Sequence, residues 1–141
     1  PCSLYAATKR SNELVAHTYS HLYQLPCTGL RFFTVYGPWG RPVMAPMIFA
    51  NAIMNEKTIK IFNKGIMSRD FTYIKDVIKA LICILDKPAI PDISFTKENP
   101  IPSSSWTTHR IYNVGNSQRV SLLDYVKSLK DRIGKKAIKE F

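Results

Sequence analysis

Apolar and small residues at the start of the chain recur with the period of an amphipathic helix. They repeat at steps of three and four residues, at Leu4, Ala7, Ser11, Leu14, Thr18 and Leu22. Ser3 has the side chain of a helix N-cap, and Pro26 lies just beyond the last repeat. The pattern therefore predicts a helix over residues 3–24.

Short β-branched and aromatic runs follow, separated by further helical stretches. Residues 28–35 (TGLRFFTV) predict a buried strand that ends in a loop rich in glycine and proline. The pattern then predicts helices over 44–56 and 74–86, strands over 58–62 and 110–114, and a turn over 63–65. A long helix followed by a buried strand is half of a parallel α/β unit, so the predicted fold class is α/β.

The segment from residue 87 to residue 108 has a different composition. It contains prolines and the run Ser103–Ser105, so we expect an irregular insertion or surface loop. Beyond it, Ser121 and Asp124 resemble a capping box at the start of a helix that stops at Gly134. Residues 137–141 resemble the beginning of another strand.

The composition argues against several classes of protein. Hydrophobic residues make up 45% of the 141 residues, which is ordinary for a globular domain. The longest apolar stretch, residues 80–85, is too short to span a bilayer, and the first residues do not resemble a targeting peptide. We therefore expect a cytoplasmic protein without a membrane partner.

The cysteines and histidines do not form a metal-binding pattern. The three cysteines lack disulfide or metal spacing, and Cys83 is expected to be a small apolar residue in the core of a helix. His17 and His21 lie four residues apart, but Thr18 stands where a zinc helix has glutamate, and His109 is isolated in the sequence. We expect both helix histidines to be helix-face residues and expect no metal.

The net charge of +10 leaves more than one interpretation open. It is consistent with a lysine-rich solvated surface, with a site for an anionic small molecule, or with nucleic-acid binding. The lysines are spread along the chain, and the only tight run is Lys135-Lys136. Because dense basic clusters with interleaved aromatics are missing, we expect no nucleic-acid partner.

Tyr5 and Lys9 are the first candidates for chemistry. Four residues apart on a helix, they share one face. An ammonium group near a phenol favours the phenolate and lowers the tyrosine pKa, so Tyr5 would be a general base near neutral pH. The spacing alone is weak evidence, because many such pairs are surface contacts.

Three blocks surround this pair with a more specific pattern. Residues 3–42, residues 68–74 (SRDFTYI) and residues 111–116 (IYNVGN) resemble the extended short-chain dehydrogenases/reductases, and are most similar to the UDP-glucuronate 4-epimerases. The resemblance implies a partial Rossmann-like doubly wound fold plus a small α/β substrate-binding region. Residues 1–43 would end the NAD-binding domain, and residues 44–141 would bind the nucleotide sugar, with the proline- and serine-rich loop at about 87–108.

The resemblance also implies the cofactor NAD and roles for the residues around it. Tyr5 would take the proton from the sugar 4-hydroxyl, and Lys9 would hydrogen-bond the nicotinamide ribose. Tyr36, Gly37 and Pro38 would form the loop beside the nicotinamide. Hydride would leave C4, the 4-keto sugar would turn over, and hydride would return to the opposite face, which interconverts UDP-glucuronate and UDP-galacturonate.

Five further residues would contact the UDP-sugar. Thr34 would approach the sugar, Arg41 would face the substrate, and Arg69 would pair with the diphosphate. Ile61 and Phe62 would lie against the uracil. Without the resemblance, the two arginines would be read as surface residues and Thr34 as a strand residue without a partner. The family usually has an acid where this chain has a valine, after the pair Arg41-Pro42.

Two parts of the family pattern are missing from the sequence. These are the glycine-rich turn that binds the NAD diphosphate and the catalytic serine or threonine upstream of the tyrosine. We therefore expect the isolated chain to be inactive, to bind NAD weakly at best, and to expose an apolar face. The missing NAD-binding half would act in cis or in trans, and the complete enzyme would be a homodimer.

Other functions stay open at this level. Within the enzymes, the chain also resembles part of a nucleotide-sugar 4,6-dehydratase or decarboxylase, because these share the tyrosine-lysine pair. From other classes, it could be a non-catalytic remnant, an interaction module, or a basic binding domain unrelated to sugars.

Overall fold

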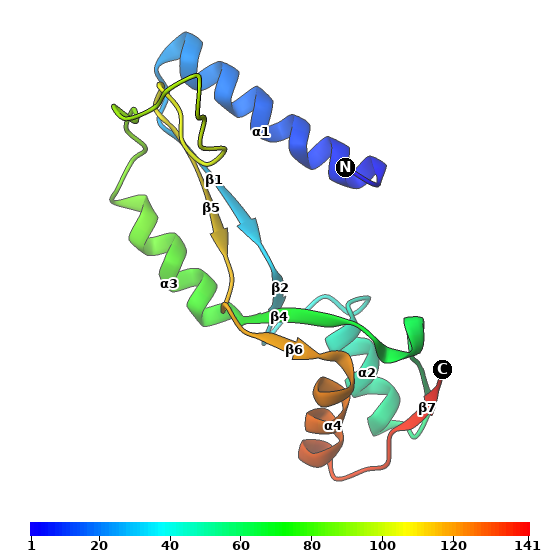
Figure 1. Ribbon diagram of the computed structural model, residues 1–141. Coiled ribbons are helices and arrows are strands. Elements are labelled where there is room, and N and C mark those ends of the chain that lie inside the picture. Colours follow the sequence, from blue (N-terminus) through cyan, green and yellow to red (C-terminus); the bar gives the residue numbers. More distant parts are fainter. The chain divides into compact units, whose positions relative to one another are not determined.

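A computed structural model describes all residues, Pro1–Phe141, as a mixed α/β chain (Figure 1). The elements in chain order are α1 (Leu4–Tyr23), β1 (Cys27–Phe32), β2 (Thr34–Tyr36), α2 (Ala45–Met54), β3 (Thr58–Lys60), the 3₁₀ helix η1 (Phe62–Gly65), β4 (Ser68–Tyr73), α3 (Ile74–Leu85), β5 (His109–Val114), β6 (Arg119–Ser121), α4 (Leu122–Ile133) and β7 (Ile138–Glu140). The predicted α/β class is confirmed.

The chain forms two compact units that interleave along the sequence. Unit 1 consists of Pro1–Arg31 and Ile78–Val114, and unit 2 of Phe32–Val77 and Gly115–Phe141. These units are defined by contacts within the chain. The predicted boundary at residue 43 separates cofactor binding from substrate binding, and it stays a prediction.

Unit 1 contains α1 and the pair β1–β5. Ser3 caps α1 as predicted, because its Oγ accepts the N–H of Ala6 at 3.1 Å. The helix ends at Gln24 in the left-handed conformation (φ 54°). Strands β1 and β5 are paired and run in the same direction (Figure 1). Residues 86–108 contain no helix or strand, which confirms the predicted irregular segment.

The expectation for Cys83 is wrong, because its side chain is exposed. Apolar residues occupy every position of α3 from Ala80 to Leu85, so they point to all sides of the helix. Only Val77 of this helix is buried, and the neighbouring Ile82 is 55% exposed. Cys83 lies on a side of the helix that no other part of the chain covers.

Unit 2 is organised around β4, which the sequence pattern did not predict. It pairs with β2 in parallel, with Thr34 opposite Phe71, and with β6 in antiparallel, with Ser68 opposite Ser121. The predicted strand 28–35 is interrupted at Phe33, and its two pieces, β1 and β2, belong to different sheets. Strands β3 and β7 form a separate parallel pair.

The core of unit 2 lies between α2, α4 and β3. It consists of Phe49, Ile53, Ile59, Ile61 and Val126. The α4 cap is confirmed, since the Oγ of Ser121 accepts the N–H of Asp124 at 3.1 Å, and the helix ends at Gly134 (φ 75°). No helix in the structure has both the length and the apolar character needed to cross a membrane.

Candidate functional site

The tyrosine-lysine pair lies on the first turns of α1. The ammonium nitrogen of Lys9 is 5.5 Å from the centre of the Tyr5 ring, so the two side chains share one face as predicted. Tyr5 is 72% exposed. Its hydroxyl is therefore accessible to a ligand.

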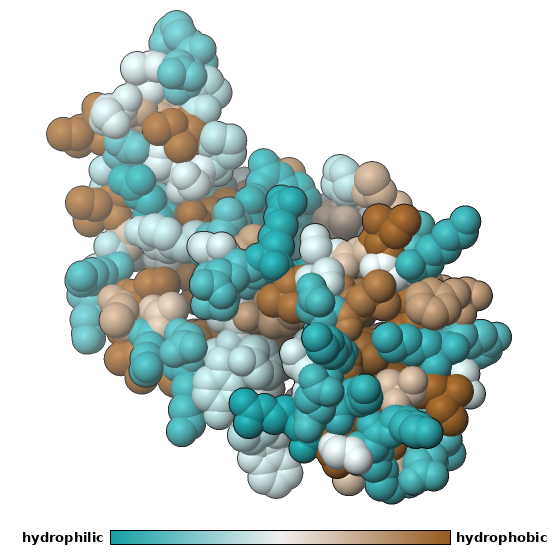
Figure 2. Space-filling model, turned by 60° about the horizontal axis from the view of Figure 1, so that its bottom comes forward, coloured by the Kyte–Doolittle hydropathy of each residue, from teal (hydrophilic) through white to brown (hydrophobic).

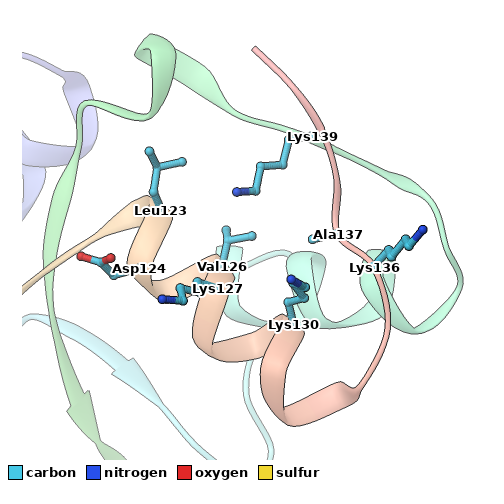
Figure 3. Close-up of a pocket in the computed structure, with 8 residues that line it drawn as sticks. All are labelled: Leu123, Asp124, Val126, Lys127, Lys130, Lys136, Ala137 and Lys139. Atoms are coloured by element: carbon cyan, nitrogen blue, oxygen red, sulfur yellow. The ribbon is translucent and has the colours of Figure 1, made fainter.

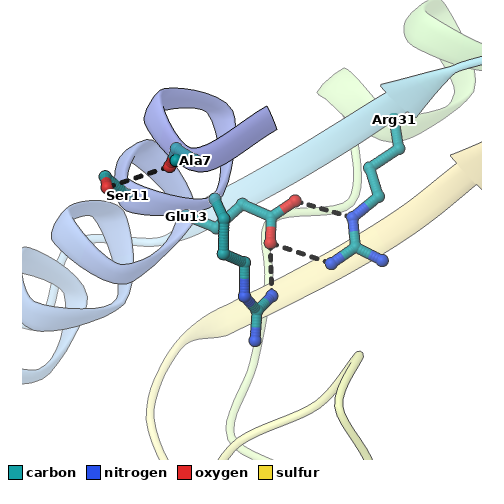
Figure 4. A network of polar contacts seen from close by, with 5 residues as sticks. Ala7, Ser11, Glu13 and Arg31 are labelled. Atoms are coloured by element: carbon teal, nitrogen blue, oxygen red, sulfur yellow. Dashed lines mark hydrogen bonds and ion pairs between the residues drawn. The ribbon is translucent and has the colours of Figure 1, made fainter. Parts of the chain in front are cut away.

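An ion-pair network fixes α1 against β1 within unit 1. The carboxylate of Glu13 accepts two hydrogen bonds from Arg31, from Nε at 2.6 Å and from Nη2 at 2.8 Å, and a third from Arg10 (Figure 4). The hydrogen bonds from Arg31, and then those from Arg10, lower the pKa of Glu13 to about 2 against an opposing effect of burial. The network thus holds the helix that presents Tyr5 in a fixed orientation to β1.

Near its C-terminal end, α1 packs on the segment before β5. The Nε2 of His17 lies 2.7 Å from the Oγ of Ser105, and its ring contacts those of Trp106 and His109 with centres 5.1 Å apart. His109 is therefore not isolated, although sequence distance suggested that it was. Burial, followed by the nearby His17, lowers the pKa of His109.

Much of α1 is not covered by other residues, and this confirms the expected exposed apolar face. Its one buried residue is Ser20. Its exposed hydrophobic residues are Leu4, Tyr5, Leu14, Val15, Tyr19, Leu22 and Tyr23. Hydrophobic side chains also reach the surface, between hydrophilic ones, on the face drawn in Figure 2.

The loop after β2 depends on a glycine. Gly37 has φ +139°, and a Cβ at this position would lie 2.5 Å from Cγ2 of Ile74. The rings of Tyr36 and Tyr73 contact each other with centres 5.5 Å apart. The loop therefore follows the end of β2 closely along the start of α3.

A cavity of about 210 Å³ opens beside this sheet in unit 2, and we call it the Arg69 cavity. It brings together three of the predicted substrate residues, Thr34, Phe62 and Arg69. Ile61 does not line it, because its side chain is buried in the core, and Arg41 is exposed outside it. The roles of all five stay predictions.

The side chains of β4 alternate between the Arg69 cavity and the opposite face of the strand. Arg69 and Phe71 line the cavity, while Asp70 between them points to the other face. There its carboxylate accepts the backbone N–H groups of Asn116 at 2.9 Å and Ser117 at 2.8 Å. Asp70 thus fastens the loop after β5 to the strand that presents Arg69.

Several lining residues were not predicted. They are Met44, Ala45, Pro46, Phe49, Lys60, Met67, Phe71 and Leu122. Lys60 adds a second cation to the lining of the cavity that Arg69 lines. The alternation in β3, where Ile59 is buried and its neighbours are exposed, is a signal that would have put Lys60 on the outer face.

An aromatic stack borders the same region. The rings of Phe71 and Tyr125 lie parallel with centres 4.5 Å apart. Burial raises the pKa of Tyr125 to about 12. The stack ties β4 to α4.

The tyrosine-lysine pair and the three cavity residues Thr34, Phe62 and Arg69 lie within the part of the chain that matches a known family. Residues 1–115 match the NAD dependent epimerase/dehydratase family, and the chain belongs to it.

Some similar proteins carry names that are more specific than the family name. The chain is 52% identical over 141 residues to Protein CapI of Staphylococcus aureus, covering 100% of this chain and 42% of the relative. It is 44% identical to a probable UDP-glucuronate 4-epimerase of Rhizobium meliloti, covering 98% of this chain and 41% of the relative. The chain therefore spans about two fifths of the length of these relatives.

A solved structure shows the same fold. It is UDP-glucuronic acid 4-epimerase from Bacillus cereus in complex with UDP-glucuronic acid and NAD, with a TM-score of 0.80 and 35% identity. The match covers 100% of this chain and 40% of that chain.

Proposed function

We propose that this chain is the C-terminal part of an NAD-dependent epimerase that interconverts UDP-glucuronate and UDP-galacturonate, as precursors of surface or capsular polysaccharides. The observation that supports this most directly is the Arg69 cavity, where an arginine, an exposed aromatic ring and the first residue of β2, Thr34, meet. In this proposal the cavity takes the nucleotide and diphosphate of the substrate.

The chemistry of the lining suits this ligand. The guanidinium of Arg69 offers paired N–H donors to phosphate oxygens, and Lys60 adds a second positive charge. Phe62 is 74% exposed, so its ring is free to stack on a base. Thr34 contributes a hydroxyl to the same cavity, where it would meet the sugar.

The tyrosine-lysine helix fits the cofactor side of the reaction. NAD, when bound, supplies the hydride acceptor. On this chain Lys9 would hold a ribose hydroxyl and stabilise the phenolate of Tyr5, while the loop Tyr36-Gly37-Pro38 would lie beside the nicotinamide. The oxygen of Tyr5 would take the proton of the sugar 4-hydroxyl and give it back after hydride return.

Substrate binding is testable on the chain itself. UDP-glucuronate should bind, and Arg69→Gln should weaken binding about tenfold or more, because a charge-assisted contact to phosphate is lost. Isothermal titration calorimetry measures this. Arg132→Gln, an exposed arginine of α4 that removes the same charge, is the matched control and should bind as the wild type does. Equal weakening by both variants would contradict the proposal.

The activity is testable once the chain is joined to a glycine-rich NAD-binding half. With NAD present, the joined protein should convert UDP-glucuronate to UDP-galacturonate, and Tyr5→Phe should slow conversion by about a hundredfold or more. The products also separate the alternatives. Release of CO₂ would indicate a decarboxylase, and accumulation of a 4-keto-6-deoxy sugar from a UDP-hexose would indicate a dehydratase.

A further inference from the structure

Four lysines line a hollow between α4 and the residues that lead into β7 (Figure 3). The hollow has a volume of about 570 Å³ and belongs to unit 2. Its lining residues are Leu123, Asp124, Val126, Lys127, Lys130, Lys136, Ala137 and Lys139. None of them lines the Arg69 cavity, so this lysine hollow is a separate feature.

The hollow combines an apolar floor with a cationic rim. Val126 is fully buried, and with Leu123 it provides aliphatic surface. The side chain of Lys139 extends from β7 toward these two residues, and Lys130 reaches up from the helix (Figure 3). The end of Lys136 is turned away from the others (Figure 3).

The four lysines of the rim outnumber the acidic residues of the lining. The structure records no ion pair for the four lysines, and the one acid, Asp124, accepts a hydrogen bond from the Oγ of Ser121 at 2.6 Å. By contrast, the adjacent Lys135 pairs with Glu56 at 3.3 Å. Like charges gathered around one hollow repel each other, and a bound anion relieves that repulsion.

The helix itself accounts for only part of the cluster. A lysine near a helix C-terminus is stabilised by the partial negative charge there, which explains Lys130 in the last turn of α4. Lys136 and Lys139 lie beyond the helix end at Gly134, so this effect does not reach them. Their placement on the opposite wall needs another reason.

We propose that the lysine hollow binds a small molecule that carries a phosphate or diphosphate group. Its volume lies within the range of small-molecule sites, and its cations come from both walls, Lys127 and Lys130 from α4 and Lys139 from β7. An extended nucleic acid would favour a longer basic stripe with interleaved aromatic residues, and the lining contains no aromatic residue. The floor of Leu123 and Val126 suits the apolar part of a compact anion.

The test uses the whole chain and inorganic pyrophosphate, at constant ionic strength. Lys130→Gln/Lys139→Gln should weaken pyrophosphate binding about tenfold, because two charge-assisted contacts are lost. Lys57→Gln/Lys75→Gln is the matched control, since both lysines are exposed residues of unit 2 outside the hollow. It should change the affinity by less than about twofold, in line with a screened long-range effect. Equal loss in the two double variants would overturn the proposal.

Pyrophosphate also suits the Arg69 cavity, so the two sites must be separated. In the Arg69→Gln variant, backbone NMR signals of residues 123–139 should still shift on titration. If pyrophosphate shifts only signals around Arg69, and none of 123–139 in either protein, the hollow is not a site. This result would leave the proposed function untouched, just as loss of UDP-glucuronate binding in Arg69→Gln would leave the hollow untouched.

A second measurement does not depend on variants. Pyrophosphate should slow acetylation of Lys130 and Lys139 by an amine-reactive reagent about fivefold in the wild type, with Lys57 unaffected, because bound anion covers these amines. Unchanged rates would overturn the proposal. So would tighter binding of a single-stranded oligonucleotide than of pyrophosphate at the hollow, which would make it part of a nucleic-acid surface.

Discussion

Individual residues of unit 2 hold the cavity in shape from its outer side. Arg69 and Asp70 are neighbours in the sequence but differ in what they contact. Arg69 faces the cavity, and Asp70 fastens the loop after β5. The same loop begins at Gly115, where a Cβ would lie 2.3 Å from the Phe33 ring and 2.8 Å from an oxygen of Asp70. Because the atoms around Gly115 are packed this closely, even one added carbon atom would force this region to shift.

Gly37 gives the sharpest test at this scale. Gly37→Ala should destabilise the chain by about 2 kcal/mol or more, because strain at positive φ adds to the clash with Ile74. Gly134→Ala is the matched control, as Gly134 also has positive φ (+75°) but nothing within 4 Å of a new Cβ. It should cost only about 1 kcal/mol. Urea unfolding measures both, and equal costs would show that the contact with Ile74 is not limiting.

At the scale of elements, α1 depends on polar contacts because few of its apolar residues are covered. Glu13 bridges Arg10 and Arg31, and the latter belongs to β1. The helix backbone is internally regular, with the hydroxyl of Ser11 donating to the carbonyl of Ala7 at 3.0 Å (Figure 4). The link to β1 therefore rests on few groups.

This link has a predictable pH dependence. The folded-state pKa of Glu13, about 2, lies below the ordinary value of 4.5, so its contribution to stability is complete above pH 4.5 and is lost as the pH falls toward 2. Glu13→Gln should lower the free energy of unfolding by about 1 kcal/mol or less at pH 7, since the pair is partly exposed. The difference in unfolding free energy between Glu13→Gln and the wild type should shrink as the pH falls from 4.5 toward 2, as measured by urea unfolding.

The exposed Glu98 provides the control, since Glu98→Gln should leave the unfolding free energy unchanged at both ends of that range. A deficit in Glu13→Gln that persisted at pH 2 would mean that the side chain acts through packing and not through its charge.

The elements with a strong hydrophobic periodicity were predicted from the sequence. A strand that is stabilised only by pairing with other strands was missed. Helix α1, its cap and the irregular segment before β5 follow from local pattern. Strand β4 was missed because Arg69 and Asp70 interrupt any apolar alternation, and only its partners β2 and β6 stabilise it. Thr34, Phe62 and Arg69 were predicted from a resemblance, whereas the alternation of β3 places Lys60 on the outer face and only the fold places it at the cavity.

At the scale of the whole molecule, each sheet joins distant parts of the chain. Strands β5, β6 and β7 pair with β1, β4 and β3, respectively. All three later strands follow the irregular segment 86–108, and all three partners precede it. In both units, the sheets are thus completed by strands from the last quarter of the chain.

Cleavage in the irregular segment tests this closure. A protease site placed between Lys97 and Glu98, in an exposed stretch outside any helix or strand, should be cut without loss of structure. The two pieces should co-elute in native size-exclusion chromatography and separate in urea, because sheet pairing holds them together. Uncut chain under both conditions is the control, and separation in native buffer would contradict the prediction.

The late position of these strands also bears on synthesis. As the chain leaves the ribosome, β1 and β3 emerge long before β5 and β7, and of the early strands only β2 and β4 find each other at once. Until β5 and β7 emerge, β1 and β3 lack their partners and are open to wrong ones. A nascent chain whose early strands wait for late partners is expected to be bound by chaperones at the ribosomal tunnel exit.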